Sequence, residues 1–400
     1  MAHVRSLFFT GHASESESKA QEAKRLGRPS SLIWNITNRC NLLCTHCYMS
    51  ATGRSAPDQL TDEQSYEMIE NMRKAKVPVV FLSGGEPMMR KNFWEILERI
   101  NAAGVRPTIS TNCTFIDAQS AQRLADNGVR FIATSLYGPR DFHDQMVCVP
   151  GTYDKIINAI AQLRKVGVKV VIKVALSKDT YPYIYDLIQQ AKDMDCSMVY
   201  ICDLITSGRS QGADDSRITN EQWREFCDFV IEEVADPEND FEYDIGAIPS
   251  VIPYIARGLT QRGLDVTKGL ERLKIFSACP VGQGHMTVNS EGGVMPCQFA
   301  QDWTLGNIYE IGFAEATARL AEIDAAVPEG MCSPQQCNYS EMCRGCRVKA
   351  WQRTGSAASS TSCCNNDSGC SATGPNPMAE DITCILNAQE RKESCPMPVL

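Results

Sequence analysis

Six short runs of apolar and β-branched residues recur through the first half of the chain, and amphipathic helical stretches lie between them. The runs occupy residues 31–37, 77–83, 106–110, 130–136, 168–176 and 197–204. One of the intervening helices should begin after Thr61, because Gln64 completes a capping-box pattern three residues later. Strands that are apolar almost throughout and alternate with helices are typical of a parallel sheet covered by helices. The pattern therefore predicts an α/β fold, a partial (β/α)6 TIM-like barrel, with its chemistry at the carboxyl ends of the strands.

The character of the sequence changes along the chain, and these changes suggest domain boundaries. We expect an N-terminal extension over residues 1–30, the barrel over 31–235 and a helical connector over 236–278. From residue 279 onward cysteine, glycine and turn residues dominate, which predicts a small Cys-rich α+β domain over 279–386. Within it, residues 355–377 form a low-complexity insertion rich in Ser, Asn and Gly, and residues 387–400 form a C-terminal tail.

Composition and charge disfavour several classes of function. The chain has 400 residues and a formal net charge of −9, which argues against binding to a nucleic-acid backbone. It contains no run of about 18 or more apolar residues and no secretory signal, so we expect a cytoplasmic protein without a membrane span. Its 19 cysteines are better explained as reduced thiolates that bind metal than as disulfides.

The stretch CNLLCTHC lies directly after the first predicted strand and contains Cys40, Cys44 and Cys47. Thiolates with this spacing can hold three irons of a 4Fe–4S cluster and leave the fourth iron without a protein ligand. An open metal position indicates catalysis, because structural sites close their ligand shells. A chelating small molecule with an amine and a carboxylate would fill that position. The alternative is a zinc knuckle whose fourth ligand is His46 or a distant cysteine.

Further motifs follow the later strands, at the edge that a barrel would bring together. SGGEP (83–87) follows the second strand, STN (110–112) the third and SLYG (135–138) the fourth. Together with CNLLCTHC, this series resembles the radical S-adenosylmethionine (SAM) superfamily over residues 31 to 204. The resemblance implies that SAM chelates the unique iron and is cleaved by one electron to methionine and a 5′-deoxyadenosyl radical, which abstracts a substrate hydrogen. It also implies SAM-positioning roles for Gly84, Gly85, Glu86, Pro87, Asn112, Ser135, Lys173 and His46.

The chemistry of several of these residues agrees with such roles, and for some of them a simpler role is open. The two glycines let the backbone approach a ligand closely, and the Glu86 carboxylate can accept a charge-assisted hydrogen bond from an ammonium. His46 either packs near the adenine or is an ordinary packed residue. Lys173 either contacts a ligand or is a solvated or salt-bridged strand lysine. Cys113 follows STN where relatives usually have glycine.

Seven cysteines near the C-terminus form a second array, and the surrounding stretches are CPVGQGH, CRGCRVKAWQRTG and PMAEDITC. The array resembles the SPASM extension of radical SAM enzymes, which implies one or two auxiliary 4Fe–4S clusters. By this resemblance one cluster would use Cys332, Cys337, Cys343 and Cys384, and a second would use Cys279, Cys297 and Cys346. His285 stands where some relatives place a fourth ligand, although we favour a hydrogen-bonded loop histidine. A zinc ribbon is the alternative for the whole array.

Two features depart from the SPASM pattern. Four residues separate Cys332 from Cys337, where relatives commonly have two. The low-complexity insertion adds Cys363, Cys364 and Cys370. We interpret it as a flexible surface insertion, with an extra metal site or redox-active thiols as the alternative.

The sequence also favours one class of substrate. The stretches WNITNRCNLLCTHCY, SGRS (207–210) and PMAEDITC are more similar to enzymes of anaerobic haem and haem d1 synthesis than to peptide maturases. The resemblance implies oxidative decarboxylation or deacetylation of a tetrapyrrole, with peptide or protein maturation (a thioether, a C–C crosslink or a cofactor precursor) as the alternative. An iron–sulfur electron carrier is the alternative of another class. Such an enzyme needs an electron donor such as flavodoxin or ferredoxin, and Arg140, Lys173 and Arg209 are candidates to pair with substrate carboxylates.

Overall fold

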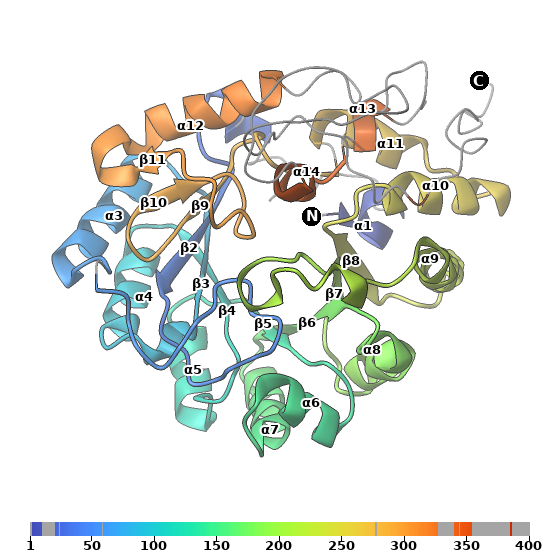
Figure 1. Cartoon of the computed structure of the whole chain (residues 1–400), viewed down its shortest axis with the longest axis horizontal. Coiled ribbons are helices and arrows are strands. Elements are labelled where there is room, and N and C mark those ends of the chain that lie inside the picture. The colour runs from blue at the N-terminus through green and yellow to red at the C-terminus, as the bar shows by residue number, and fades with distance from the viewer. Residues whose placement is uncertain are drawn as a thin grey trace.

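The computed structural model describes residues 2–9, 21–23, 25–57, 59–276, 278–326, 340–343, 345–353 and 385. Its centre is a sheet that curves into an open barrel, with helices on the outer side (Figure 1). The six predicted runs are strands of this sheet, and each pairs in parallel with the next one along the chain. The predicted α/β barrel is therefore confirmed. The strands are β2 (Ser31–Thr37), β3 (Val79–Gly84), β4 (Arg106–Ser110), β5 (Phe131–Ser135), β6 (Lys169–Leu176) and β7 (Met198–Asp203).

The sheet is larger than the six predicted strands. Strand β8 (Glu242–Gly246) lies in the segment expected to be a helical connector and pairs in parallel with β7. On the other side, β9 (His285–Val288) pairs in parallel with β2, and β10 (Gly293–Met295) and β11 (Gly306–Asn307) follow as antiparallel strands. The short β1 (Ala2–His3) pairs with β8. The start of the Cys-rich segment thus continues the barrel sheet.

Amphipathic helices cover the outer face of the barrel. The capping box at Thr61 and Gln64 starts α3, as the sequence predicted, and α4 buries Phe93, Ile96 and Leu97 against the sheet. The helices around the barrel are α3 (Asp62–Lys74), α4 (Phe93–Ala102), α5 (Ala118–Asp126), α6 (Arg140–Val147), α7 (Thr152–Lys165), α8 (Ile184–Asp193) and α9 (Asn220–Ala235). The others are α1 (Val4–Phe9), α10 (Val251–Gln261), α11 (Thr267–Phe276), α12 (Ile308–Ala326), α13 (Ser340–Cys343) and α14 (Arg347–Arg353).

The core lies between the sheet and these helices. Strand β2 is buried along almost its whole length, and Trp34 and Ile36 are fully inaccessible to solvent. Phe93 on α4 and Trp223 on α9 are also among the largest buried side chains. Each buried side chain of this size contributes about 1.5–3 kcal/mol of transfer free energy. This packing holds the carboxyl ends of the strands in place.

A buried ion-pair group fastens α14 to the barrel. Asp203, the last residue of β7, has a fully buried carboxylate, which accepts hydrogen bonds from Arg217 and from Lys349 of α14. Breaking a buried pair from one side costs about 3–5 kcal/mol, because the remaining charge stays desolvated. The group therefore fixes the C-terminal helix beside the ends of β6 to β8.

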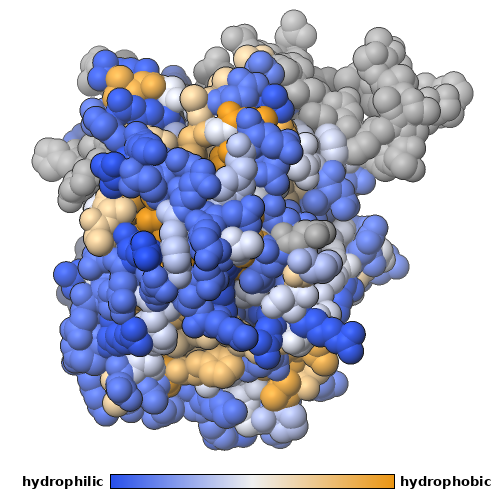
Figure 2. All heavy atoms as spheres, turned by 90° about the vertical axis from the view of Figure 1, so that its left-hand side faces the viewer, coloured by the Kyte–Doolittle hydropathy of each residue, from blue (hydrophilic) through white to orange (hydrophobic). Residues whose placement is uncertain are grey.

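No helix in the described part of the chain is long and apolar enough to cross a membrane. The face that carries α3 and α12 is mostly hydrophilic, and its hydrophobic residues are scattered (Figure 2). Predictions about Cys332, Cys337 and Cys384, the insertion at 355–377 and the tail at 387–400 concern residues outside the described ranges.

Candidate active site

The CNLLCTHC motif forms a loop at the carboxyl end of β2, the position predicted for chemistry. The backbone N–H of Cys40 donates to the carbonyl of Thr52 at 2.7 Å, and the N–H of Cys47 donates to the carbonyl of Cys44 at 3.3 Å. The loop is also tied to the end of α6, because Leu43 N–H donates to the carbonyl of Val147 at 3.1 Å. These bonds hold three partly buried thiols on one short loop.

The electrostatics of two of the three thiols fit a cationic partner. Burial, with a smaller contribution from the neighbouring thiolates of the loop, raises the pKa of Cys40 to about 11 and that of Cys44 to about 12. The free thiols of Cys40 and Cys44 are therefore held neutral, and their thiolates need a positive partner. Among the described residues no three such side chains are arranged around a single metal ion. A 4Fe–4S cluster held by these three thiolates therefore stays a prediction.

The two glycines of SGGEP bring the end of β3 against the segment that leads into the cysteine loop. Gly84 has φ of +137°, and a Cβ atom there would lie 2.1 Å from the carbonyl oxygen of Thr37. A Cβ atom on Gly85 would lie 2.3 Å from the carbonyl oxygen of Arg39. Backbone bonds of 2.8 Å join Gly85 N–H to Thr37 and Glu86 N–H to Arg39. The motif thus sets the position of Cys40.

Glu86 has a role that the sequence did not reveal. Its buried carboxylate accepts hydrogen bonds from the N–H of Met88 at 3.0 Å, the hydroxyl of Thr111 at 2.8 Å and the N–H of Asn112 at 2.7 Å. Burial raises the pKa of Glu86 to about 7, although these three donors lower it. The predicted contact with an ammonium remains a prediction. The carboxylate ties the β3 loop to the STN loop that follows β4.

The STN loop also contacts the cysteine loop. The Asn112 amide donates to the side-chain oxygen of Asn41 at 2.8 Å and lies 3.9 Å from the Cys40 sulfur. Cys113 is fully buried and has φ of +61°, the left-handed conformation that glycine adopts easily. The residue that departs from the family pattern therefore keeps the backbone conformation of a glycine.

The candidates Ser135 and Lys173 are direct neighbours on β5 and β6. The ammonium of Lys173 donates to the Ser110 hydroxyl at 3.1 Å and lies 5.9 Å from the centre of the Tyr200 ring. Burial lowers its pKa, and no carboxylate among the described residues forms an ion pair with it. Of the alternatives for Lys173, the lysine paired with a carboxylate is therefore not found among the described residues.

Two other basic residues proposed for substrate carboxylates are engaged elsewhere. Arg140 is exposed and forms an ion pair with Asp154. Arg209 donates to the carbonyls of Cys44 at 2.7 Å and Ala51 at 2.6 Å, and its N–H donates to the carbonyl of Cys47 at 3.0 Å. The SGRS segment after β7 thus clamps the cysteine loop.

Replacing Arg209 with glutamine is expected to lower the free energy of unfolding by about 2–3 kcal/mol and to reduce iron retention, because two charge-assisted hydrogen bonds are lost. Denaturant unfolding and iron content after reconstitution measure both effects. Arg54→Gln, at an exposed position of the same loop, is the control. Wild-type stability and iron content in Arg209→Gln would contradict the clamp.

His46 belongs to a row of packed aromatic rings. Its ring meets Tyr137 edge to face at 4.6 Å, and Tyr137 stacks on His143 at 5.5 Å. Burial lowers the pKa of His46 and of His143 to about 4, so both are neutral at pH 7. This packing favours the ordinary packed role, and a contact of His46 with adenine remains a prediction.

The low pKa of His143 predicts sensitivity to acid. Between its usual pKa of 6.5 and about 4 the unfolded chain binds more protons than the folded one, so stability falls as the pH drops through this window. In His143→Phe the free energy of unfolding should fall by about 1–3 kcal/mol less over this pH window than in the wild type. Urea unfolding at pH 7 and pH 5 measures the difference, and the same pH dependence in both proteins would refute the prediction.

Three of the four auxiliary cysteines that the structure describes, Cys279, Cys297 and Cys346, lie near one another. Burial raises the pKa of Cys297, and the charges of Cys346 and Cys279 raise it further. The three cysteines predicted to share the second cluster therefore lie within electrostatic reach of one another. His285 is elsewhere engaged, because its Nδ1 lies 2.7 Å from the Ser31 hydroxyl at the amino end of β2.

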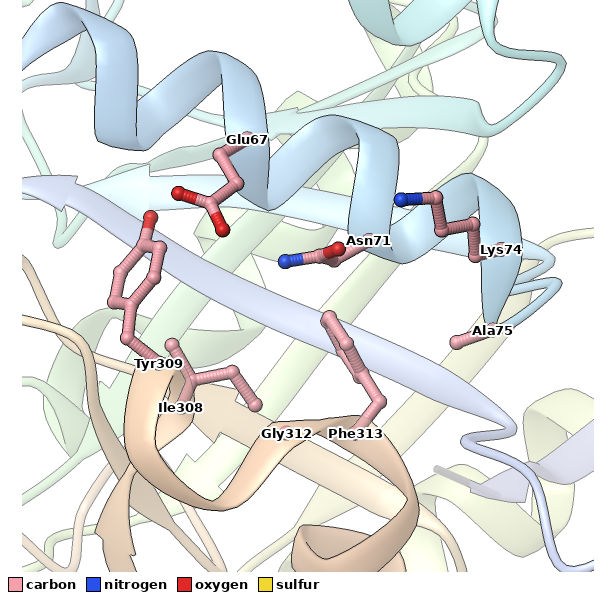
Figure 3. Close-up of a pocket in the computed structure, with 8 residues that line it drawn as sticks. All are labelled: Glu67, Asn71, Lys74, Ala75, Ile308, Tyr309, Gly312 and Phe313. Carbon is pink, nitrogen blue, oxygen red and sulfur yellow. The ribbon is translucent and has the colours of Figure 1, made fainter.

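A groove of about 260 Å³ lies between α3 and α12 on the outside of the barrel. Glu67, Asn71 and Lys74 line it from α3, opposite Tyr309 and Phe313 of α12 (Figure 3). It contains none of the predicted site residues, and we assign no chemistry to it.

Comparisons with known proteins agree with this geometry. Residues 34–191 match the Radical SAM superfamily, and residues 279–347 match SPASM, an iron–sulfur cluster-binding domain. The fold is similar to the crystal structure of Streptococcus suis SuiB bound to S-adenosylmethionine. The TM-score is 0.64 at 16% identity, and the match covers 84% of this chain and 77% of that one.

Curated relatives match most of the chain. An AdoMet-dependent heme synthase of Oleidesulfovibrio alaskensis is 26% identical and covers 86% of this chain and 92% of its own. A pre-heme d1 synthase of Dinoroseobacter shibae is 25% identical, and the match covers 90% of this chain and 87% of that protein. A mycofactocin maturase MftC of Mycolicibacterium smegmatis is 25% identical, and the match covers 81% of this chain and 79% of that protein. Together, the radical SAM and SPASM domains imply 4Fe–4S clusters and SAM as cofactors. The chain is therefore an enzyme with a radical SAM domain over residues 34–191 and a SPASM domain over residues 279–347.

Proposed function

We propose that this enzyme modifies the side chains of a tetrapyrrole by oxidative decarboxylation or deacetylation, in haem-type synthesis without oxygen. The observation that carries the proposal is the near full-length match to relatives named heme synthase and pre-heme d1 synthase. The short stretches SGRS and WNITNRCNLLCTHCY support it. In the structure SGRS lies against the cysteine loop, next to the proposed reaction centre.

Each part of the site has an assigned task. Cys40, Cys44 and Cys47 would hold the first 4Fe–4S cluster, which would supply the electron for cleavage of bound SAM. Backbone groups of Gly84, Gly85 and Pro87, together with Asn112, Ser135, Lys173 and His46, orient SAM. Glu86 keeps the β3 and β4 loops in register and presents its remaining acceptor capacity to the SAM amine. The enclosing strands keep water away from the reacting centre.

The C-terminal cysteines serve the second half of the reaction. A product with a new double bond requires removal of one more electron from the substrate radical, and buried clusters can accept it. Cys279, Cys297 and Cys346 hold one auxiliary cluster, and Cys332, Cys337, Cys343 and Cys384 hold another. A flavodoxin or ferredoxin in the cytoplasm supplies the electron for SAM cleavage.

The test is 5′-deoxyadenosine formation by reconstituted enzyme under anaerobic conditions, with SAM and a strong reductant. It is run with and without a sirohaem-derived tetrapyrrole that carries its carboxylates. The proposal predicts stimulation by the tetrapyrrole and release of carbon dioxide or acetate. A slow rate that the tetrapyrrole does not change would contradict it.

Peptide maturation is the second candidate, supported by the match to a relative named mycofactocin maturase. In that case a precursor peptide would stimulate 5′-deoxyadenosine formation and would lose mass as hydrogen or carbon dioxide. Mass spectrometry of the peptide after turnover decides between the two candidates. Unchanged peptide together with modified tetrapyrrole would exclude this one.

A further inference from the structure

Two aromatic rings join the first cysteine loop to the loop that carries Cys297. Tyr48 directly follows Cys47, and Phe299 lies two residues after Cys297. The rings pack edge to face with centroids 5.1 Å apart and planes at 74°. Edge-to-face pairs have a defined geometry and contribute about 0.5–1.5 kcal/mol beyond their burial. The contact therefore links the two cysteine sites, which are far apart in the sequence.

Phe299 contacts the Cys297 thiol as well as the Tyr48 ring. Its backbone N–H donates a hydrogen bond to the Cys297 sulfur. N–H groups that donate to ligating sulfurs tune the potential of iron–sulfur clusters. Phe299 thus carries both the ring that contacts Tyr48 and the N–H that contacts the Cys297 sulfur.

Tyr48 is held equally firmly at the other end. A hydrogen bond joins its phenol to Ser83 at the end of β3. Gly208 packs so closely against the backbone that a Cβ there would lie 2.4 Å from the carbonyl oxygens of both Cys47 and Tyr48.

We propose that the Tyr48–Phe299 ring pair couples the two cysteine sites, so that the state of the auxiliary site sets the reduction potential of the SAM-binding cluster. The inference rests on the cluster assignments made above. Rings in direct edge-to-face contact can pass a displacement of one ring on to the other. Each ring is also within two residues of a predicted ligand. Tyr48 and Phe299 are thus positioning residues that act through Cys47 and Cys297.

The test is a double-mutant cycle on reconstituted holoenzyme. The midpoint potential of the SAM-binding cluster is measured by anaerobic EPR titration in wild type, Cys297→Ala, Phe299→Leu and the double variant. Loss of the auxiliary cluster in Cys297→Ala should shift the potential in the wild-type background. In the Phe299→Leu background the same loss should shift it by less than half as much. An equal shift in both backgrounds, or no shift in wild type, would overturn the inference.

Further variants separate coupling from folding. Tyr48→Leu should reduce the coupling as Phe299→Leu does, whereas Tyr48→Phe keeps the ring and should keep the coupling. Phe131→Leu, at an exposed phenylalanine on β5, should leave the coupling unchanged. Iron content is measured in every variant. If Cys297→Ala keeps all its iron, the cluster assignment is wrong; if it loses iron and the potential stays unchanged, the coupling alone is wrong.

Discussion

Cys44→Ala is expected to form no detectable 5′-deoxyadenosine from SAM, while the C-terminal part of the chain keeps its iron. The two thiolates that remain cannot hold a cubane cluster in place. Of the two loop thiols whose pKa burial raises, Cys44 has the higher pKa. The variant should lose roughly four irons per chain. Iron and sulfide analysis after reconstitution, together with chromatography of the SAM products, measures both effects.

Cys148→Ala is the matched control for this experiment. Cys148 is exposed at the end of α6, close in sequence to the segment that contacts the cysteine loop, and it belongs to neither array. Its replacement should leave iron content and SAM cleavage unchanged. SAM cleavage that survives in Cys44→Ala would refute the assignment of the first cluster.

Gly85→Ala is expected to reduce SAM cleavage by more than about 100-fold, because a displacement of about 1 Å at a reaction centre has an effect of this size. The new Cβ would lie 2.3 Å from the Arg39 carbonyl oxygen, and the neighbour is backbone that cannot rotate away. The β3 loop must therefore move away from the segment that leads into Cys40. Iron content, SAM affinity and the rate of 5′-deoxyadenosine formation are the measurements.

Gly53→Ala provides the comparison, because no atom lies within 4 Å of a Cβ at this position of the same loop region. It should behave like wild type in all three measurements. A Gly85→Ala protein with the wild-type rate would mean that the close approach of the two loops is not required for SAM cleavage.

The elements with local signals were predictable from the sequence. The apolar runs predicted β2 to β7, and the pattern at Thr61 and Gln64 predicted the start of α3. The position of the cysteines directly after the first run predicted that their loop follows β2. Each of these signals lies within a few neighbouring residues. Strand β8 was missed because its sequence, EYDIG, has polar residues at alternate positions and no continuous apolar run.

The contacts that complete the site could not be predicted, because they join residues far apart in the chain. Nothing in SGRS indicates that Arg209 donates to the carbonyl of Cys44, since that contact depends on where β7 ends relative to β2. The hydrogen bond from Thr111 to Glu86 likewise depends on the neighbouring ends of β3 and β4. The sequence predicts the groups that carry the chemistry, and the fold determines which groups position them.

The central claim is that Cys40, Cys44 and Cys47 hold a cluster with one iron open to SAM. The most direct test is EPR spectroscopy of the reconstituted, reduced wild-type enzyme before and after addition of SAM. The account predicts that SAM changes the spectrum of one cluster and that the change is absent in Cys44→Ala. A spectrum that SAM leaves unchanged, in protein with its iron intact, would contradict the account.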